Sequence, residues 1–245
     1  MTPPPREWDA ASYDRLAAPM TTRGVELLDR LELRGDETVV DAGCGTGQVT
    51  AALLERLPGG RVVALDASQA MLDGAARRFA GDPRVELVRA DLERELPVGG
   101  PVDAIVSTST LHWVRGHDTL FARFAAALAP GGMLVAEYGG AGNIASVLAA
   151  LHALGHDEHP WTFAEPDEEL ARLRSAGFAD ADAQLVPRPA PIPPEELEHY
   201  LATVVLGWHA DRLGPERGPQ LVRDVAVALP EPVMDYVRLI VVARR

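Results

Sequence analysis

The sequence predicts an α/β fold built on a parallel sheet that is covered by helices on both faces. Three observations support this prediction. Between residues 38 and 137, short apolar or β-branched segments alternate with segments of helical periodicity. The apolar segments are continuous, as expected for strands that are buried on both faces. The 245 residues are enough for one large domain or two small ones with a sizeable core.

The predicted elements follow one another in a regular order. From Trp8 to Leu33, apolar residues recur at helical spacing, which predicts two short helices separated near Pro19. Because parallel strands need crossover connections, helices are expected between them. The pattern predicts five strands, at residues 38–40, 61–65, 85–88, 102–106 and 133–137, with helices at residues 49–57, 70–80 and 120–128.

The regular alternation ends after Tyr138. Residues 187–194 contain five prolines and are predicted to form an extended linker. Around this linker the pattern predicts helices at residues 144–154, 166–176, 195–213 and 218–229, and strands at residues 181–186 and 233–243. The sequence therefore predicts seven strands in total.

The chain has no lysine, so that all 23 of its basic residues are arginine. This excludes chemistry through a lysine Schiff base, as in pyridoxal-phosphate enzymes and lysine aldolases. It also excludes the phosphate-binding loop that ends in Gly-Lys-Ser/Thr. With 36 acidic residues the formal charge is −13, which argues against general binding of nucleic acids or anionic membranes.

A single cysteine, Cys44, means that no intrachain disulfide can form, which fits a reducing cytoplasm. The first residues lack the apolar stretch of a secretion signal, and no segment approaches the ~18 apolar residues of a membrane helix. We therefore expect a cytoplasmic protein with no membrane partner, either a monomer or a homodimer.

The most informative segment runs from Asp41 to Gln48, directly after the first predicted strand. Its pattern is Asp-x-Gly-x-Gly-x-Gly, in which glycines allow a tight turn and a close approach of a ligand to the backbone. The dinucleotide-binding fingerprint would need its third glycine at position 48, which is Gln. A carboxylate at Asp41 is unfavourable beside a pyrophosphate but suits a cation such as an ammonium group.

Two further acids stand near the ends of the next predicted strands. Asp66 ends the second strand and can accept hydrogen bonds from two ribose hydroxyls. Asp91 follows the third strand and is placed to accept from an adenine amino group. Together with Asp41, these acids indicate a ligand made of adenosine, a positively charged appendage and no phosphates.

Further motifs support one family resemblance. They are Asp41-Ala42-Gly43-Cys44-Gly45-Thr46-Gly47, Leu65-Asp66-Ala67-Ser68, Met71-Leu72, Arg89-Ala90-Asp91-Leu92, Pro130-Gly131-Gly132, Trp8-Asp9 with Tyr13, the segment 107–114 and the segment 235–239. The chain resembles the class I S-adenosylmethionine-dependent methyltransferases, and within them the trans-aconitate methyltransferase group. The resemblance is most specific for residues 39–137. Ala42 departs from the group, which often has a larger apolar residue there.

The resemblance implies a Rossmann-like, doubly wound sheet of seven strands plus a helical lid. The sheet would be mostly parallel, with the last strand antiparallel and inserted between the fifth and the sixth. The expected organisation is an N-terminal helical cap at 1–33, a cofactor-binding core at 34–138, and the rest of the core at 139–245. Lid insertions are expected near 139–163 and 190–230.

The resemblance also implies S-adenosyl-L-methionine as cofactor, with S-adenosyl-L-homocysteine as product. Asp41 and the backbone of Gly43 and Gly45 would hold the methionine part, and Asp66 the ribose. Ser107, at the end of the fourth strand, would face the reacting methyl group. The remaining expected cofactor contacts are Ala42, Cys44, Gln48, Ala67, Met71, Ala90, Asp91 and Leu92.

His112 is the candidate catalytic residue, because it lies on the loop that leaves the fourth strand, where ligands of parallel sheets gather. A base is needed only if the acceptor atom is protonated; a carboxylate, with a pKa of about 4, needs none. His112 is thus expected to act either as a base or as a residue that orients the acceptor.

The acceptor pocket is expected to be closed and rich in aromatic residues, which favours a small molecule. Arg23 and Arg188 are candidate partners of an acceptor carboxylate. His152, His156 and His159 have weak metal-ligand spacing, but Gly155 and Pro160 interrupt their helix, and we predict no metal site. The predicted pocket residues are Trp8, Tyr13, His112, Trp113, Tyr138, Asn143, Trp161 and Trp208, with Tyr200 in the cover.

We therefore expect a methyltransferase that acts on a small metabolite, with the oxygen of a carboxylate or hydroxyl as acceptor atom. Two alternatives stay open at this point. One is carbon or nitrogen methylation of a natural product. The other is a protein of the same fold that binds the cofactor without transferring methyl, as a cyclase or a binding module.

Overall fold

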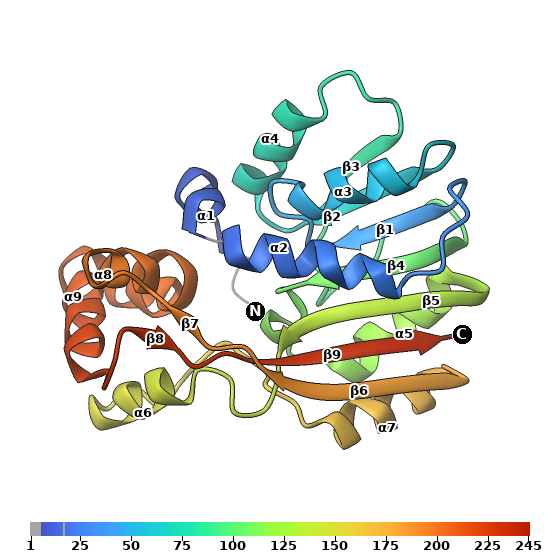
Figure 1. The fold of residues 1–245 in the computed structure, drawn as a ribbon. Coiled ribbons are helices and arrows are strands. Elements are labelled where there is room, and N and C mark those ends of the chain that lie inside the picture. The colour runs from blue at the N-terminus through green and yellow to red at the C-terminus, as the bar shows by residue number, and fades with distance from the viewer. Residues whose placement is uncertain (1–5, 17) are drawn as a thin grey trace.

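The computed structural model describes residues 6–16 and 18–245, and its centre is a mixed β-sheet (Figure 1). Within these residues the sheet has seven strands in the order β3-β2-β1-β4-β5-β9-β6. The strands are β1 Thr38–Ala42, β2 Arg61–Asp66, β3 Val85–Arg89, β4 Val102–Thr108, β5 Leu128–Gly139, β6 Asp180–Pro187 and β9 Val237–Arg244. The first five strands pair in parallel, as predicted.

Strand β9 is antiparallel to both of its neighbours and lies between β5 and β6. Val135 of β5 is opposite Val242, and Leu185 of β6 is opposite Leu239. This topology confirms the expected fold class, a Rossmann-like sheet with its last strand reversed.

Helices cover both faces of the sheet because successive strand residues point to opposite sides. Val39 belongs to a core with α2, α3 and α4, whereas Val40 belongs to a core with α5 and α7. The helices are α1 Ala10–Leu16, α2 Ala18–Leu27, α3 Gln48–Arg56, α4 Gln69–Arg78, α5 His117–Ala127, α6 Ala145–Ala153, α7 Pro166–Ala176, α8 Leu197–Tyr200 and α9 Gly207–Ala228.

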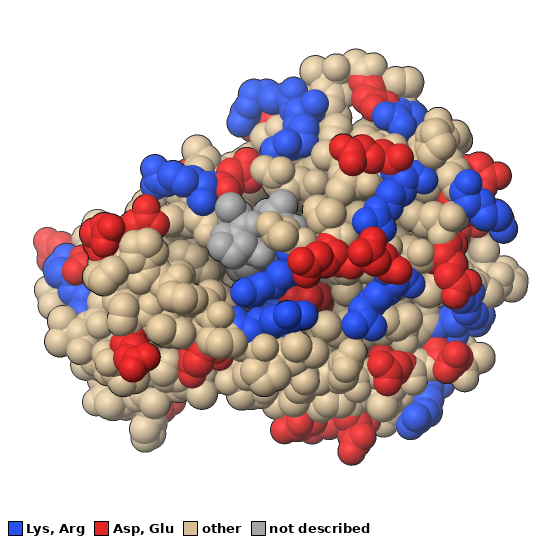
Figure 2. All heavy atoms as spheres, viewed as in Figure 1, with Lys and Arg blue, Asp and Glu red and all other residues tan. Residues whose placement is uncertain are grey.

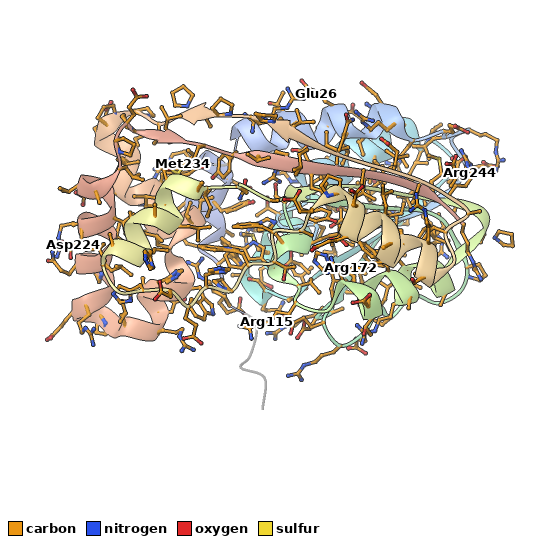
Figure 3. The ribbon with its side chains drawn as sticks, turned by 90° about the horizontal axis from the view of Figure 1, so that it is seen from below. Glu26, Arg115, Arg172, Asp224, Met234 and Arg244 are labelled. Carbon is orange, nitrogen blue, oxygen red and sulfur yellow. The ribbon has the colours of Figure 1, made fainter. Side chains whose placement is uncertain are left out.

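A third core lies beyond one end of the sheet. It joins α6, α8, α9 and the single-turn helix Leu201–Val205, and we call it the lid cluster. Its buried members include Leu16, Trp161 and Tyr236. Figure 3 shows Met234 at this end of the molecule and Arg244 at the other end. The carboxyl ends of the parallel strands face the lid cluster, so a site can form between them (Figure 1).

Several segments differ from the sequence prediction. Strand β5 begins at Leu128 rather than at residue 133, and the predicted helix at 195–213 is divided into α8, the helix Leu201–Val205 and the start of α9. The predicted strand at 233–243 is divided into β8 Val233–Met234 and β9, and β8 pairs with Ala190–Pro191, which forms strand β7 inside the predicted linker. The break predicted between the helices at 195–213 and 218–229 is a kink at Gly214, which has φ 81° within α9 and precedes Pro215. No helix in the described part of the chain is long and apolar enough to cross a membrane.

Candidate functional site

A cavity of about 280 Å³ lies between the carboxyl ends of the parallel strands and the lid cluster. Its walls include the residues that follow four of these strands: Gly43 after β1, Ala67 after β2, Asp91 after β3 and Ser109 after β4. In open parallel sheets this edge is where ligands bind, because the loops that leave the strands converge there. The cavity is therefore the candidate site.

The loop of residues 43–47, which we call the glycine loop, contributes Gly43 and Gly45 to the wall of the cavity. The N–H groups of Gly43 and Cys44 both donate to the carbonyl of Leu65, each at 2.8 Å, which fixes the loop against β2. A Cβ on Gly43 would lie 2.1 Å from Oγ1 of Thr110, so the close approach of Thr110 requires glycine there. At Gly45, with φ 55°, the nearest atom to such a Cβ is 4.0 Å away, which leaves this backbone open towards a ligand.

Asp66 connects the glycine loop to the start of α4. One oxygen of its carboxylate accepts from the N–H of Gly45 at 2.9 Å, and the other accepts from the N–H of Ser68 at 2.9 Å. Burial raises the pKa of Asp66, and these backbone hydrogen bonds oppose the rise. The carboxylate lines the cavity at the end of β2, where the sequence predicted a ribose contact.

Asp41 lies behind the glycine loop and is fully buried. Its Oδ2 accepts from the Thr50 hydroxyl at 2.6 Å, whereas its Oδ1 has no hydrogen-bond partner among the described residues. Burial raises the pKa of Asp41 to about 6, despite the hydrogen bond from Thr50. A buried carboxylate oxygen without a partner is costly, so the fold maintains at this position an acceptor that a cationic or N–H-bearing group can satisfy.

The other predicted cofactor residues fall into two sets. Asp91 lines the cavity, and its carboxylate accepts from the N–H of Glu93 at 3.0 Å. Ser107 does not line it: this residue is fully buried, and its hydroxyl donates to the carbonyl of Ala42 at 2.7 Å, because β4 lies beside β1. The structure places Ala67, Met71, Ala90 and Leu92 in the lining, and places Asp41, Ala42, Cys44 and Gln48 outside it.

His112 lies in a turn after β4, Leu111–Trp113, and is 8% exposed. Its Nδ1 accepts from the N–H of Gly139 at 3.3 Å. Burial and the charge of Arg238 hold the pKa of His112 well below its usual value, so the ring is neutral at pH 7. A neutral ring that accepts at Nδ1 bears its proton on Nε2. His112 is therefore set up as a hydrogen-bond donor at Nε2.

Aromatic rings line the part of the cavity around Trp113, Trp161 and Phe163. We call this part the acceptor side, because the predicted acceptor-pocket residues lie there. Trp161 and Phe163 are parallel within 12°, with ring centroids 5.8 Å apart, and Trp113 meets the edge of Trp161 at 5.8 Å. Trp8 meets Trp113 at 5.4 Å. The structure thus brings together seven predicted pocket residues: Trp8, Tyr13, His112, Trp113, Asn143, Trp161 and Trp208.

Tyr138, the eighth predicted pocket residue, is fully buried away from the cavity. Its hydroxyl donates to Glu169 of α7 at 3.0 Å, and the same carboxylate contacts Nδ1 of His117. Nε2 of His117 contacts the carbonyl of Leu111 at 2.9 Å, and Arg172 bonds the second oxygen of Glu169 at 3.3 Å. This buried network joins β5, α5 and α7 directly beneath His112.

Arg238 is a cavity residue that the sequence prediction missed. It is 3% exposed, and its Nε donates to Glu137 at 3.2 Å while its Nη2 donates to the Ser109 hydroxyl at 2.8 Å. The available signal was an arginine near the start of strand β9, followed by the apolar residues 239–243. Neither Arg23 nor Arg188, the predicted carboxylate partners, lines the cavity.

Residues 6–8 form a strap that connects the two sides of the cavity. The carboxylate of Glu7 accepts from the Ser68 hydroxyl at 2.8 Å and from the N–H groups of Gln69 and Ala70, each at 3.2 Å. Arg6 donates to Asp211 of α9 at 3.2 Å. Trp8, between these contacts and Tyr13, lines the cavity.

The three histidines with weak metal-ligand spacing, His152, His156 and His159, lie in the segment that follows α6 and in its last turn. His152 contacts the carboxylate of Asp157 at 2.5 Å, and both side chains are exposed. His159 instead stacks on Trp161, with ring centroids 5.7 Å apart. Among the described residues, no group of three or more His, Cys, Asp or Glu side chains is placed to hold a metal ion.

Comparison with known proteins identifies the family. Residues 39–132 match the model of a methyltransferase domain. The chain is 36% identical over 182 residues to a trans-aconitate 2-methyltransferase of Paracidovorax citrulli (strain AAC00-1), covering 74% of this chain and 68% of that protein. This chain belongs to the S-adenosylmethionine-dependent methyltransferases.

Two further methyltransferases show the extent of the likeness. A trans-aconitate 2-methyltransferase of Acidovorax ebreus (strain TPSY) is 42% identical over 131 residues, or 54% of this chain, and the chain spans about half (49%) of that protein's length. Phosphoethanolamine N-methyltransferase 2 of Haemonchus contortus, solved with S-adenosyl-L-methionine, superposes with a TM-score of 0.66 at 17% identity. That superposition covers 96% of this chain and 56% of the other, and it shows the shared fold.

The site fits the cofactor of this methyltransferase family. Gly45 leaves its backbone open to a ligand, and Asp66 presents a carboxylate at the end of β2. Asp41, with an unpartnered Oδ1 among the described residues, lies behind this loop and outside the cavity lining. S-adenosylmethionine bears an ammonium group, a sulfonium and ribose hydroxyls, and it has no phosphates, so these residues match its chemistry.

Proposed function

We propose that this methyltransferase transfers a methyl group to an oxygen of a small-molecule acid, with a carboxylate as the preferred acceptor. One observation supports this most directly. The cavity that is lined by the glycine loop is also lined by a buried arginine and a neutral histidine, Arg238 and His112. The methyltransferase relatives named for a carboxylate substrate, trans-aconitate, support the same class of acceptor.

The proposed roles on the cofactor side follow from the family resemblance and, for Asp66, Gly45 and Asp91, from their place in the cavity lining. Asp66 holds the ribose, Asp41 and the backbone of Gly45 hold the methionine part, and Asp91 lies at the adenine. When bound, the cofactor supplies a methyl group that its sulfonium has already activated. The protein therefore acts by aligning the acceptor and by excluding water from the cavity.

His112 and Arg238 act on the acceptor in this proposal. Because a carboxylate is ionised at pH 7, no proton has to be removed from it. The Nε2–H of His112 and the guanidinium of Arg238 orient one carboxylate oxygen and leave the other free to react. A phenol or alcohol would need a base, and the proton on Nε2 of His112 makes that role unfavourable.

We also propose that the acceptor is a free small molecule and that the protein is cytoplasmic. The net charge of −13 opposes binding to phosphate backbones. On the face shown in Figure 2, acidic and basic side chains are interspersed, without a continuous basic surface. The single cysteine is compatible with a reducing cytoplasm. The absence of lysine leaves arginine as the basic residue that can bind an acidic acceptor.

The test is a transfer assay with methyl-labelled cofactor and matched acids, amides, phenols and amines. We expect label in the acids alone, in a product from which mild alkali releases the label as methanol, since esters hydrolyse and ethers and methylamines do not. Asp66→Ala is the control that should abolish both cofactor binding and labelling. Label that enters phenols or amines but not acids, or no label despite cofactor binding, would contradict the proposal.

A further inference from the structure

The aromatic residues of this chain are concentrated around its cavity. All four tryptophans line it: Trp8, Trp113, Trp161 and Trp208. The chain has only five phenylalanines and four tyrosines besides, and Phe163 and two tyrosines also line the cavity. Since aromatic residues make up 5% of the chain, this concentration indicates an apolar wall, although Trp161 and Tyr236 also belong to the core of the lid cluster.

The rings on the acceptor side share one orientation. Trp161 lies within 12° of parallel to Phe163, and Phe163 lies within 29° of parallel to His112. These rings are stacked on one another, and a further aromatic ring can offset-stack parallel to rings that share one orientation. A saturated, puckered body of equal size would touch the same rings over a smaller area.

The charges around the cavity limit the charge of the acceptor. The charged side chains that line it, among the described residues, are three arginines and three acids: Arg6, Arg115, Arg238, Asp66, Asp91 and Glu93. Arg6 is already paired with Asp211, and Arg238 with Glu137. The lining is thus neutral, and it does not offer the excess positive charge that three carboxylates would require.

Arg238 can still bind one anionic group. Its Nε and Nη2 donate to Glu137 and Ser109, whereas no described residue accepts from its Nη1. Because the guanidinium is 3% exposed and lines the cavity, this nitrogen can bind a ligand in a largely dry environment. Arg115, by contrast, is exposed at the surface, where Figure 3 shows it at the edge of the molecule.

We propose that the acceptor is a planar, apolar acid with a single carboxylate, held by Nη1 of Arg238 and Nε2 of His112 while its body stacks on Trp161 and Phe163. This inference rests on the proposed function and narrows it, because trans-aconitate has three carboxylates and no apolar body. In the transfer, the free carboxylate oxygen forms a bond to the methyl carbon. The pair of the broken C–S bond stays on sulfur, which yields a neutral thioether and a methyl ester and releases no proton.

The test measures binding separately from turnover. Isothermal titration calorimetry of the protein saturated with S-adenosylhomocysteine compares four probes. They are cinnamate, its neutral amide, the saturated 3-cyclohexylpropanoate, and trans-aconitate. We expect cinnamate to bind at least ten-fold more tightly than each of the other three. Equal or tighter binding of trans-aconitate, or equal binding of the amide, would overturn the inference.

Variants test the role of Arg238 in the same assay. Arg238→Lys keeps a cation beside Glu137 but removes the forked donor, and we expect cinnamate to bind ten-fold more weakly with the amide unchanged. The double variant Glu137→Gln with Arg238→Gln removes both buried charges together, so that neither is left unpaired. In that variant we expect acid and amide to bind equally.

The matched control is Arg244→Gln, on the same strand but at the end far from the lid cluster (Figure 3). Arg244 pairs with Glu32, and this variant should bind all four probes as the wild type does. If Arg238→Lys binds cinnamate like the wild type, the assigned anion site is wrong.

Turnover with labelled cofactor separates the two proposals. If cinnamate binds selectively but no acid is methylated, the proposed function fails while the assigned shape of the site stands. If trans-aconitate is methylated in preference to cinnamate, the proposed function stands and this inference fails.

Discussion

Asp41 is the residue at which folding and the proposed ligand binding conflict most directly. Its carboxylate is fully buried, has one unpartnered oxygen, and has a pKa raised to about 6. Ionisation of Asp41 is therefore less favourable in the folded protein than in the unfolded chain, and it lowers the free energy of unfolding. The fold tolerates this cost at the one loop where a cationic ligand part is expected, which is typical of functional sites.

The pH dependence of stability tests this description of Asp41. In the unfolded chain the carboxyl ionises near its ordinary pKa of 3.8, whereas in the folded protein it ionises near 6. Stability from this group is therefore lost as the pH rises from about 4 to about 6, and the loss corresponds to about 3 kcal/mol above pH 6. In urea unfolding, Asp41→Asn should gain stability relative to wild type at pH 7.5 but not at pH 4.

Asp36→Asn, an exposed matched control, should show no such difference between the two pH values. Parallel curves for Asp41→Asn and wild type would contradict the assigned pKa. Because the proposed ligand is cationic there, we also expect Asp41→Asn to bind the cofactor more weakly.

The role of His112 can be separated into donor and base by two substitutions. His112→Gln keeps an N–H near the position of Nε2, whereas His112→Ala removes it. With an acid as acceptor, we expect His112→Ala to lose about 10- to 100-fold in kcat/KM, as the loss of a hydrogen bond to a charged group implies. His112→Gln should retain most of the activity.

A base role would give the opposite result. Both variants would then be equally inactive, and the wild-type rate would fall below the pKa of His112. Since that pKa lies well below 6.5, a flat profile of kcat/KM between pH 6.5 and 8.5 is expected for either role, and the two variants decide between them.

At the scale of elements, the Glu169 network is the main polar connection beneath the site. It links β5, α5 and α7 and supports both backbone segments that hold His112, namely Leu111 and the Tyr138–Gly139 peptide. Glu169 is fully buried, and its two oxygens contact His117, Tyr138 and Arg172. Figure 3 shows Arg172 on α7 near this region.

Removal of Glu169 should be strongly destabilising. Glu169→Leu leaves His117 and Tyr138 without their partner, and we expect a loss of about 3–5 kcal/mol in urea unfolding. The adjacent Glu168 is a matched control, since it bridges the same Arg172 but is exposed. Glu168→Leu should change stability by less than about 0.5–1 kcal/mol. Comparable losses in the two variants would contradict the importance of the network.

The elements differ in how far they could be predicted from sequence. The alternation from β1 to β5 depends on local periodicity and on glycine and proline at the ends, so it was predicted closely. The pairing of Ala190–Pro191 with Val233–Met234 was missed, because it depends on a contact between segments more than 40 residues apart. A two-residue strand has no periodicity to detect.

The residues of the candidate site also differ in how far they could be predicted from the local sequence. Gly43, Gly45, Asp66 and Asp91 belong to short motifs, and the structure places all four in the cavity lining. Arg238 was missed because local sequence does not show which way an arginine in an apolar strand points. Tyr138 was misplaced for the same reason: it is the second-last residue of β5, and its hydroxyl donates to Glu169 of α7 rather than facing the cavity.

At the scale of the whole molecule, the lid cluster has a hydrophobic core of its own. This core, around Val147, Leu201 and Val225, is separate from the two cores that cover the sheet. The cavity lies between the lid cluster and the sheet, so ligand contacts add to the few connections between them. Local opening of the lid cluster should therefore cost less free energy than unfolding of the sheet.

Amide hydrogen exchange measures this difference. We expect amides of α6, α8 and α9 to exchange faster than those of β1, β4 and β5 in the free protein. Addition of S-adenosylhomocysteine together with an acid should slow exchange in the helices by more than in the strands. Uniform protection across both regions would show instead that the lid cluster and the sheet open as one cooperative unit.

The strap formed by residues 6–8 has a consequence for the timing of the reaction cycle. It is fastened to α4 through Glu7 and to α9 through Arg6, with Trp8 against the cavity between them. A product that leaves past Trp8 can do so only after the contacts of Glu7 with α4 or those of Arg6 with α9 have broken. Both involve ion pairs with exposed partners, Arg89 and Asp211, which salt weakens. The dwell time of the product should then shorten as ionic strength rises.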